Sequence, residues 1–113
     1  MKRVILLACV IALGGMAVAC AAADTASAGT KPYQVAIQNF AFAPKTLVVP
    51  AGTRVVWTNR DDEAHVITSA GALFASSKAL DADDTYAVTF SKPGTYAYYC
   101  SIHPMMVGTI IVQ

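Results

Sequence analysis

Several side chains that can bind a transition metal lie close together near the C-terminus. Residues 98–108 read YYCSIHPMMVG, and within this stretch Cys100, His103 and Met106 follow a C-x-x-H-x-x-M spacing. Thiolate, imidazole and thioether groups are soft or borderline ligands that suit metals such as copper and zinc. A turn stiffened by Pro104 can bring three side chains of one short loop around a single point. The stretch therefore predicts most of a metal site that needs one more ligand.

His65 is the candidate for that ligand, because it is the only other histidine of the chain. It follows the turn sequence NRDDEA, residues 59–64, so it stands on a loop that could lie beside the C-terminal one. Two histidines and one cysteine in a plane, with a weak axial methionine, form the ligand set of blue-copper electron-transfer sites. Zinc accepts one cysteine and two histidines as well, so these residues alone leave both metals open.

The N-terminal segment has the pattern of an export signal. Lys2 and Arg3 precede an almost uncharged apolar run, which ends in small residues. The run is shorter than the roughly 20 residues that cross a bilayer core, which argues against a membrane span. We therefore expect residues 1–23 to be a signal peptide and residues 24–30 to be a flexible leader. The sequence AVAC could instead direct cleavage before Cys20, and Cys20 would then carry a lipid anchor.

Export would leave Cys100 as the only thiol of the folded domain. Cys9 departs with the signal, and Cys20 is either lost or lipidated. An exported protein with one cysteine cannot form an internal disulfide, which favours a metal ligand or a reactive thiol. From Asp24 onward there are six basic and seven acidic residues, a net charge of −1. No basic stripe of the kind that binds nucleic acid is present.

Residues 31–113 form the expected folded domain, and their pattern is typical of an all-β protein. Short runs rich in Val, Ile, Thr, Tyr and Phe recur about every eight to twelve residues, with turn signals between them. This profile predicts an all-β, Greek-key antiparallel β-sandwich of about seven to eight strands. Residues 70–84 receive no assignment. The expected strands are 33–39, 46–49, 54–59, 65–69, 85–90, 95–100 and 107–112.

Alternation along two of these strands predicts which side chains point inward. In TRVVWTN, Trp57 and Asn59 share the face opposite to Arg54, so both should face the core. In TYAYYC, Cys100 lies on the core face and Tyr99 on the outer face. We also expect Trp57 and the phenylalanines at 40, 42, 74 and 90 to be core residues.

The segments GTYAYYCSIHPMMVGTIIV and VVPAGTRVVWTNRDDEAHVITS together resemble the small blue-copper proteins, or cupredoxins. The resemblance covers nearly all of residues 31–113, and the short ligand loop is similar to that of amicyanin among the plastocyanin-like members. It implies that the ligands of one copper ion, Cu(I) or Cu(II), are His65, Cys100, His103 and Met106. It also implies that Asn59 ties the His65 loop to the Cys100 loop by hydrogen bonds.

The resemblance further implies a surface for partners. His103 would show its ring edge at an apolar end of the molecule, beside Pro104 and Met105, where a redox partner docks. Tyr99 could mark a second route for electrons, or it could be an ordinary exposed strand residue. By the same resemblance, Met105 stands at a position that holds a bulky apolar surface residue and not a ligand.

The function implied is a one-electron shuttle in the bacterial periplasm, and not an enzyme. A monomer would exchange electrons with redox proteins such as a c-type cytochrome or a periplasmic oxidoreductase. Asp61, Asp62 and Glu63 could steer a basic partner, or they could simply form a solvated turn. An exported copper carrier or buffer is the alternative. A multicopper enzyme fragment is disfavoured, because a catalytic copper needs further histidines and the chain has only two.

Overall fold

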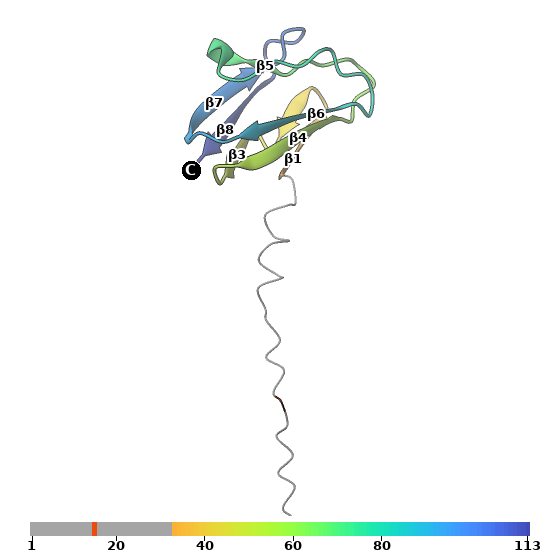
Figure 1. Cartoon of the computed structure of the whole chain (residues 1–113). Coiled ribbons are helices and arrows are strands. Elements are labelled where there is room, and N and C mark those ends of the chain that lie inside the picture. The colour runs from red at the N-terminus through yellow and green to blue at the C-terminus, as the bar shows by residue number, and fades with distance from the viewer. Residues whose placement is uncertain (1–14, 16–32) are drawn as a thin grey trace, which may run out of the picture.

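The computed structural model describes residue 15 and residues 33–113 (Figure 1). The expected signal peptide (1–23) and leader (24–30), with Cys20, lie outside the described residues. Within the described part, no helix is both long enough and apolar enough to span a bilayer.

Eight strands form two four-stranded sheets that pack face to face (Figure 1). A 3-10 turn, η1 (Ala70–Ala72), follows the fifth strand. The first sheet has the order β2-β1-β4-β6 and the second has the order β3-β8-β7-β5. The strands are β1 (Tyr33–Gln38), β2 (Ala41–Ala43), β3 (Thr46–Val49), β4 (Thr53–Asn59), β5 (Thr68–Ser69), β6 (Thr85–Phe90), β7 (Gly94–Tyr99) and β8 (Val107–Val112).

The β-sandwich expected from the sequence is confirmed, and six of the seven expected strands lie within a residue of their predicted ends. The exception is the strand expected at 65–69, because β5 begins only at Thr68 and His65 makes an isolated bridge to Leu80. The short strand β2 was not expected. It has three residues and follows a tight turn after β1, so it carries too little alternation to be recognised.

Two of the strand pairings are parallel, although an antiparallel sandwich was expected. β1 pairs with β4 and β3 pairs with β8 in parallel register, while the other pairings are antiparallel. The chain passes from β1 through β2 to β3 in the other sheet before it returns to β4, so β4 runs in the same direction as β1. Alternation of side chains does not report strand direction, which is why the sequence missed this feature.

The core lies between the sheets and follows the predicted alternation. In β4, Val55, Trp57 and Asn59 are fully buried while Arg54 is exposed. Burying one large apolar side chain contributes about 1.5–3 kcal/mol, so this layer is the main source of stability. The buried hydrophobic residues are Val35, Ile37, Phe42, Val49, Val55, Trp57, Ile67, Leu80, Phe90, Tyr98, Cys100, Met106, Ile110 and Val112.

Tyr98, two residues before Cys100, is a core residue. Its ring restricts which residue can stand opposite it on β8. Its cross-strand partner is Gly108, where an added Cβ would lie 2.3 Å from the tyrosine ring. The ring also packs edge-to-face against Trp57, with 5.4 Å between centroids. Glycine at position 108 therefore makes room for an aromatic ring in the core.

We predict that Tyr98 makes the fold sensitive to alkaline pH. Burial raises the pKa of Tyr98 to about 12 from its ordinary 10.0, although the neighbouring Trp57 opposes part of this change. The folded state therefore disfavours the phenolate, and stability present below pH 10 should be lost as the pH rises towards 12. The loss should reach about 2.7 kcal/mol, since each pKa unit corresponds to about 1.36 kcal/mol.

Urea unfolding of the wild type and of Tyr98→Phe between pH 7 and pH 12 measures this effect. The hydroxyl of Tyr98 has no hydrogen-bond partner among the described residues, so the variant should lose little stability at pH 7. Above pH 10 the variant should become the more stable of the two. Parallel stability curves for the two proteins would contradict the prediction.

Candidate metal centre

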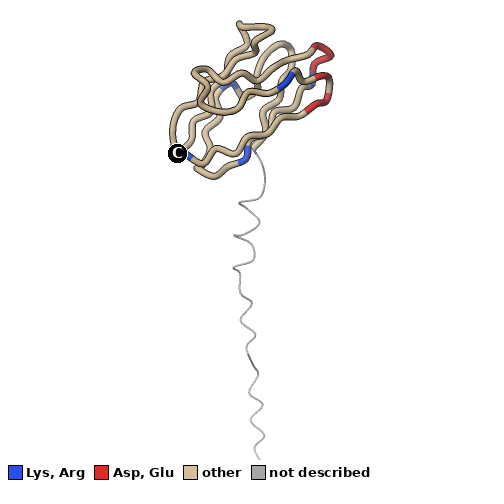
Figure 2. Tube along the Cα trace, turned by 45° about the horizontal axis from the view of Figure 1, so that its top comes forward, with Lys and Arg blue, Asp and Glu red and all other residues tan. Residues whose placement is uncertain are grey.

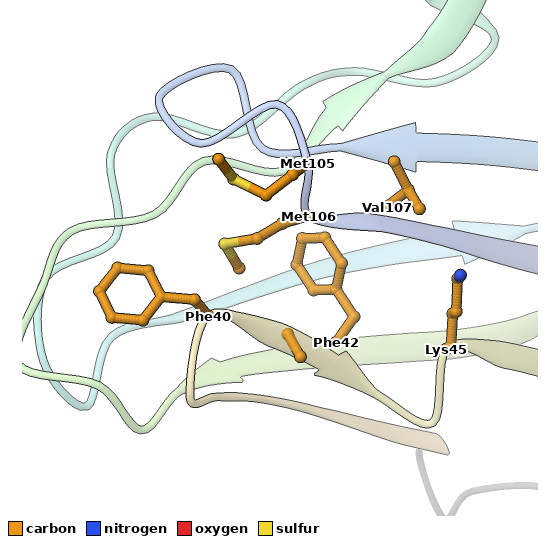
Figure 3. Close-up of a pocket in the computed structure, with 7 residues that line it drawn as sticks. Phe40, Phe42, Lys45, Met105, Met106 and Val107 are labelled. Carbon is orange, nitrogen blue, oxygen red and sulfur yellow. The ribbon is translucent and has the colours of Figure 1, made fainter.

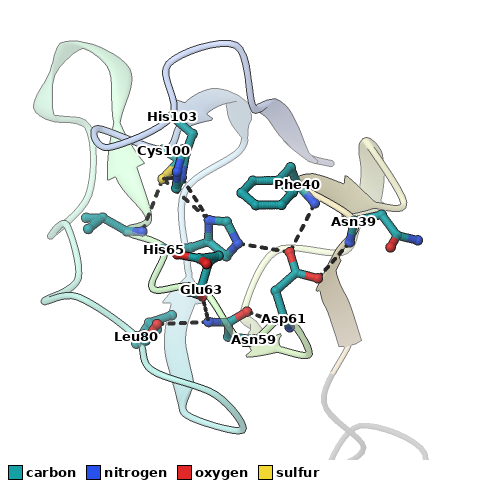
Figure 4. Close-up of polar contacts among 10 residues, drawn as sticks. Asn39, Phe40, Asn59, Asp61, Glu63, His65, Leu80, Cys100 and His103 are labelled. Atoms are coloured by element: carbon teal, nitrogen blue, oxygen red, sulfur yellow. Dashed lines mark hydrogen bonds and ion pairs between the residues drawn. The ribbon is translucent and has the colours of Figure 1, made fainter.

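His65, Cys100 and His103 come together at one end of the sandwich (Figure 4). The Sγ atom of Cys100 lies 3.9 Å from Nδ1 of His65 and 3.8 Å from Nδ1 of His103. The two Nδ1 atoms are 3.2 Å apart. Cys100 and His65 are fully buried, whereas His103 is partly exposed. The fold thus brings together three of the four ligands expected from the sequence.

The triangle formed by these three atoms has the size that one metal ion requires. The point equidistant from its corners is about 2.1 Å from each, and metal bonds to imidazole and thiolate are about 2.0 to 2.3 Å long. The donor set of two imidazoles and one thiolate fits copper or zinc.

Backbone hydrogen bonds close the loop that carries Cys100 and His103. The N–H of Cys100 donates to the carbonyl of Met106 at 3.0 Å, and the N–H of Met106 donates to the carbonyl of His103 at 2.9 Å. The loop joins β7 to β8, whose register pairs Tyr99 with Val107. The strands therefore fix both ends of the loop and with them the spacing of its side chains.

The sulfur of Cys100 is also held from the His65 side of the site. The backbone N–H of Val66 donates a hydrogen bond to Sγ at 3.3 Å. An N–H dipole directed at the sulfur orients it and favours the negative charge of a metal-bound thiolate. Val66, which follows the expected ligand His65, thus positions the expected ligand Cys100.

The two methionines of the loop lie in different environments. Met106 is 2% exposed and Met105 is 76% exposed. Met106 lines a small groove together with Phe40 and Phe42 (Figure 3). Burial beside the ligand loop is what a weak axial ligand needs, and exposure suits the surface role expected for Met105.

Asp61 connects three parts of the site (Figure 4). Its Oδ2 atom lies 2.9 Å from Nε2 of His65 and accepts the N–H of Phe40 at 3.0 Å, while Oδ1 accepts the N–H of Asn39 at 2.8 Å. An ionised carboxylate can only accept hydrogen bonds, so Nε2 of His65 carries the proton. In the neutral imidazole the lone pair of His65 is then on Nδ1, which can bind a metal ion.

The environment of Asp61 keeps its carboxylate ionised. Partial burial by itself raises the pKa of Asp61. The hydrogen bonds from the N–H groups of Phe40 and Asn39, together with His65, lower this pKa, and their combined effect is larger than that of burial. The net result is a pKa below the usual 3.8. Asp61 therefore contributes stability that is present above this ordinary pKa and is lost as the pH falls through the lowered one. Of the three acidic residues in the turn, Asp61 is thus a structural residue of the site.

Phe40 packs against both histidines, which the sequence did not suggest. Its ring meets those of His65 and His103 edge-on, with centroid distances of 5.4 Å and 5.1 Å. The residue is 49% exposed, so the expectation that it is a core residue is wrong. The reason is the turn at Asn39 and Phe40, whose φ angles are 55° and 57°. Two such residues in succession form a tight hairpin turn, which carries the ring to the rim of the sandwich.

Asn59 holds the loop of His65, but by contacts other than those expected. Its side-chain N–H groups donate to the carbonyls of Glu63 at 2.8 Å and Leu80 at 2.9 Å, and its Oδ1 accepts the N–H of Asp61 at 3.0 Å. These bonds shape the turn before His65 and tie it to the chain that follows η1. Among the described residues they do not reach the loop after Cys100. That loop is linked to the His65 side by the Val66 N–H instead.

Residues expected on the partner surface are accessible at the same end of the molecule. Pro104 and Met105 are exposed at adjacent positions of the loop, and Tyr99 is partly exposed at the end of β7. Ile102 is 51% exposed. Exposed apolar residues therefore precede and follow the partly exposed His103 in the loop.

All six acidic residues of the described chain lie on two neighbouring loops (Figure 2). Backbone hydrogen bonds join these loops, because Asn59 donates to the carbonyl of Asp84 at 2.9 Å and accepts from the N–H of Asp83 at 2.8 Å. Arg60 lies in the first of these loops directly before Asp61, and Lys78 stands three positions before Asp81, whereas Lys45, Arg54 and Lys92 lie elsewhere in the chain. The acidic corner consists of Asp61, Asp62, Glu63, Asp81, Asp83 and Asp84.

Comparison with known proteins agrees with this geometry. The family model described as a cupredoxin-like domain matches residues 9–112. Amicyanin-alpha from Methylorubrum extorquens is 32% identical over 89 residues, which cover 71% of each chain. The protein therefore belongs to the cupredoxin-like family.

Two solved structures are similar in fold and sequence. A purple cupredoxin from Nitrosopumilus maritimus superposes with a TM-score of 0.67 at 32% identity, covering 72% of this chain and 99% of that one. A copper-containing nitrite reductase from Thermus scotoductus gives a TM-score of 0.68 at 34% identity. That match covers 74% of this chain but only 22% of the reductase, so the likeness is to one part of it.

We predict that Asp61→Asn weakens metal binding much more than Asp62→Asn does. An amide has one acceptor oxygen for three donors and no charge, so His65 or the Phe40 turn loses a partner. Loss of such an outer hydrogen bond typically lowers metal affinity by about 10- to 100-fold. Competition with a chelator of known affinity measures the change for Cu(I) and Zn(II).

Asp62 is exposed in the same turn and is the matched control. Its replacement should leave the affinity within about twofold, as is usual for a surface substitution. Equal affinities for the Asp61→Asn protein and the wild type would show that the carboxylate does not position His65.

Proposed function

We propose that the protein is a type 1 (blue) copper protein that acts as a one-electron shuttle between redox proteins in the periplasm. The observation that carries this proposal is the triangle of Nδ1, Nδ1 and Sγ atoms from His65, His103 and Cys100. Met106 is proposed as the weak axial ligand. The copper ion would supply the one-electron Cu(I)/Cu(II) couple, and the residues of the chain would hold it and connect it to partners.

The way the ligands are held favours electron transfer over catalysis. His65 and Cys100 are buried, and hydrogen bonds from Asp61 and Val66 fix both side chains. A site with three strong ligands and a fourth weak one leaves no open position for a substrate. Ligands that cannot move far also suit a change of oxidation state with little rearrangement. These features support a shuttle.

His103 is proposed as the point where electrons enter and leave. It is the ligand of the triangle that reaches the surface, and the exposed Pro104 and Met105 lie next to it. A small apolar contact of this kind gives a weak complex that separates quickly, as a shuttle requires. A c-type cytochrome or a periplasmic oxidoreductase would dock here to the monomer. Tyr99 is proposed as a second, subordinate route from Cys100.

The acidic corner is proposed to steer a positively charged partner. The hydrogen bonds of Asp61 hold it within the site. Asp62 and Glu63 are exposed, as is the loop that carries Asp83. Their combined negative charge beside the site would accelerate encounters with a basic protein. An electron-transfer rate that does not change with ionic strength would contradict this role.

Two other functions are less well supported. A copper carrier usually binds through exposed, exchangeable ligands, whereas His65 and Cys100 are buried. A copper enzyme such as the nitrite reductase would need further histidines for a catalytic copper, and both histidines of this chain are already used. We propose export by residues 1–23 and a mature domain of residues 31–113 after a leader of residues 24–30. A lipid anchor at Cys20 would apply only if cleavage occurs before it.

The proposed function predicts an intense blue colour after loading with Cu(II), because a copper–thiolate bond absorbs strongly in the visible range. The colour should disappear on reduction and return on oxidation. Spectroscopy of the loaded protein, with metal content and intact mass, tests this directly. A colourless protein that binds one zinc ion and no copper would overturn the proposal, and rapid transfer of copper to a metal-free acceptor would favour the carrier.

We predict that Met106→Leu changes the visible spectrum and the reduction potential of the copper protein strongly. The substitution keeps a buried apolar side chain but removes the thioether. Met105→Leu is the matched control and should change both quantities only slightly, since Met105 is 76% exposed. The reverse result would exchange the roles of the two methionines.

A further inference from the structure

The metal position proposed above is closed to solvent on most sides. Cys100 and His65 are fully buried and Met106 is 2% exposed. Of the four proposed ligands only His103 reaches the surface, and only in part. A metal ion that loads the folded protein must therefore approach along the ligand loop.

A groove lies along this loop (Figure 3). It has a volume of about 140 Å³, which is room for a few water molecules. Phe40 forms one wall, and the same ring contacts both imidazoles. The groove is thus lined by one proposed ligand, Met106, and by the ring that contacts the two imidazoles. Its lining consists of Phe40, Ala41, Phe42, Lys45, Met105, Met106 and Val107.

Two thioethers line this groove at different depths. Figure 3 shows the side chains of Met105 and Met106 extending to the same side of the loop, with Met106 nearer to Phe40. Met105 is 76% exposed and Met106 is 2% exposed, so one residue is open to solvent and the other lies in the interior. They are the only methionines in residues 33–113. The pair therefore places one methionine at the solvent-facing surface of the loop and the next in its buried interior.

The chemistry of the lining selects for a soft ion. The groove has no carboxylate, and its one charged residue, Lys45, repels cations. A metal ion is therefore not drawn in by charge and must gain affinity from bonds to sulfur. Thioethers bind Cu(I) in preference to harder divalent ions.

We propose that Met105 is a transient ligand that captures Cu(I) at the mouth of the groove and passes it to Met106 and His103. The proposal rests on the proposed copper function and adds the route by which the site is filled. The step is an exchange of ligands, so the ion remains Cu(I) throughout. When Cys100 becomes a ligand, its thiol proton passes to solvent.

A ligand that binds Cu(I) only while the ion enters or leaves changes the rate constants of uptake and release. It leaves the equilibrium affinity unchanged. Met105→Leu keeps the apolar bulk at this position but removes the sulfur. We expect the rate constant for Cu(I) uptake by the purified metal-free protein to fall by about tenfold, which corresponds to a barrier about 1.4 kcal/mol higher. The rate of Cu(I) release to a chelator should fall by the same factor. The Cu(I) affinity and the spectrum of the oxidised protein should remain as in the wild type.

Stopped-flow mixing with a buffered Cu(I) complex measures uptake, and Zn(II) provides the comparison ion. Zinc uptake should proceed at the same rate in Met105→Leu and the wild type, because zinc gains little from a thioether. Val107→Leu is the matched control variant, since Val107 lines the same groove, is 43% exposed and has no sulfur. It should take up Cu(I) at the wild-type rate.

Two results would overturn the inference and leave the proposed function intact. One is an unchanged Cu(I) uptake rate in Met105→Leu. The other is an equal slowing of Cu(I) and Zn(II), which would assign the effect to the shape of the groove and not to sulfur. A wild-type protein that binds no copper would instead remove the proposed function, and the inference with it.

Discussion

The carboxylate of Asp61 is the contact on which the rest of the site depends. It accepts hydrogen bonds from the turn at Asn39 and Phe40 and from Nε2 of His65, so one side chain connects the β1–β2 hairpin to the first ligand. Because the carboxylate accepts a hydrogen bond from Nε2, the lone pair of the neutral His65 imidazole is on Nδ1, the nitrogen that can bind a metal. The same contact holds Phe40 against both imidazoles. Without the Asp61 carboxylate, no shared contact would fix the positions of His65 and the Phe40 ring relative to each other.

The two halves of the site are assembled from different parts of the fold. His65 and Asp61 come from the loop that follows β4 in the first sheet, whereas Cys100 and His103 follow β7 in the second sheet. The packed core between the sheets therefore sets the distance between the halves. The Val66 N–H, from the loop of His65, donates a hydrogen bond directly to the ligand sulfur of Cys100. Rigidity of the sandwich is consequently a condition for the function proposed here.

The sequence was sufficient for the sandwich and for Cys100 with His103, because alternation and ligand spacing are local patterns, and His65 could be added because it is the only other histidine. It was not sufficient for features that arise from contacts between distant segments. Phe40 was expected in the core because it is aromatic, and only the hairpin turn shows that it lies at the rim. Asp61 looked like one of three equivalent turn acids, since its partners are 21 and 22 residues away. An acidic residue four positions before a candidate histidine was the one available signal.

The closed form of the loop between Cys100 and Met106 has a consequence for how such proteins diversify. Its internal hydrogen bonds and the β7–β8 pairing define it almost without help from the loop of His65. Residues at its tip, such as Met105, could therefore be exchanged while the buried imidazole and its carboxylate stay in place. Partner choice could then change at the tip of the loop while the residues that retain the metal stay the same.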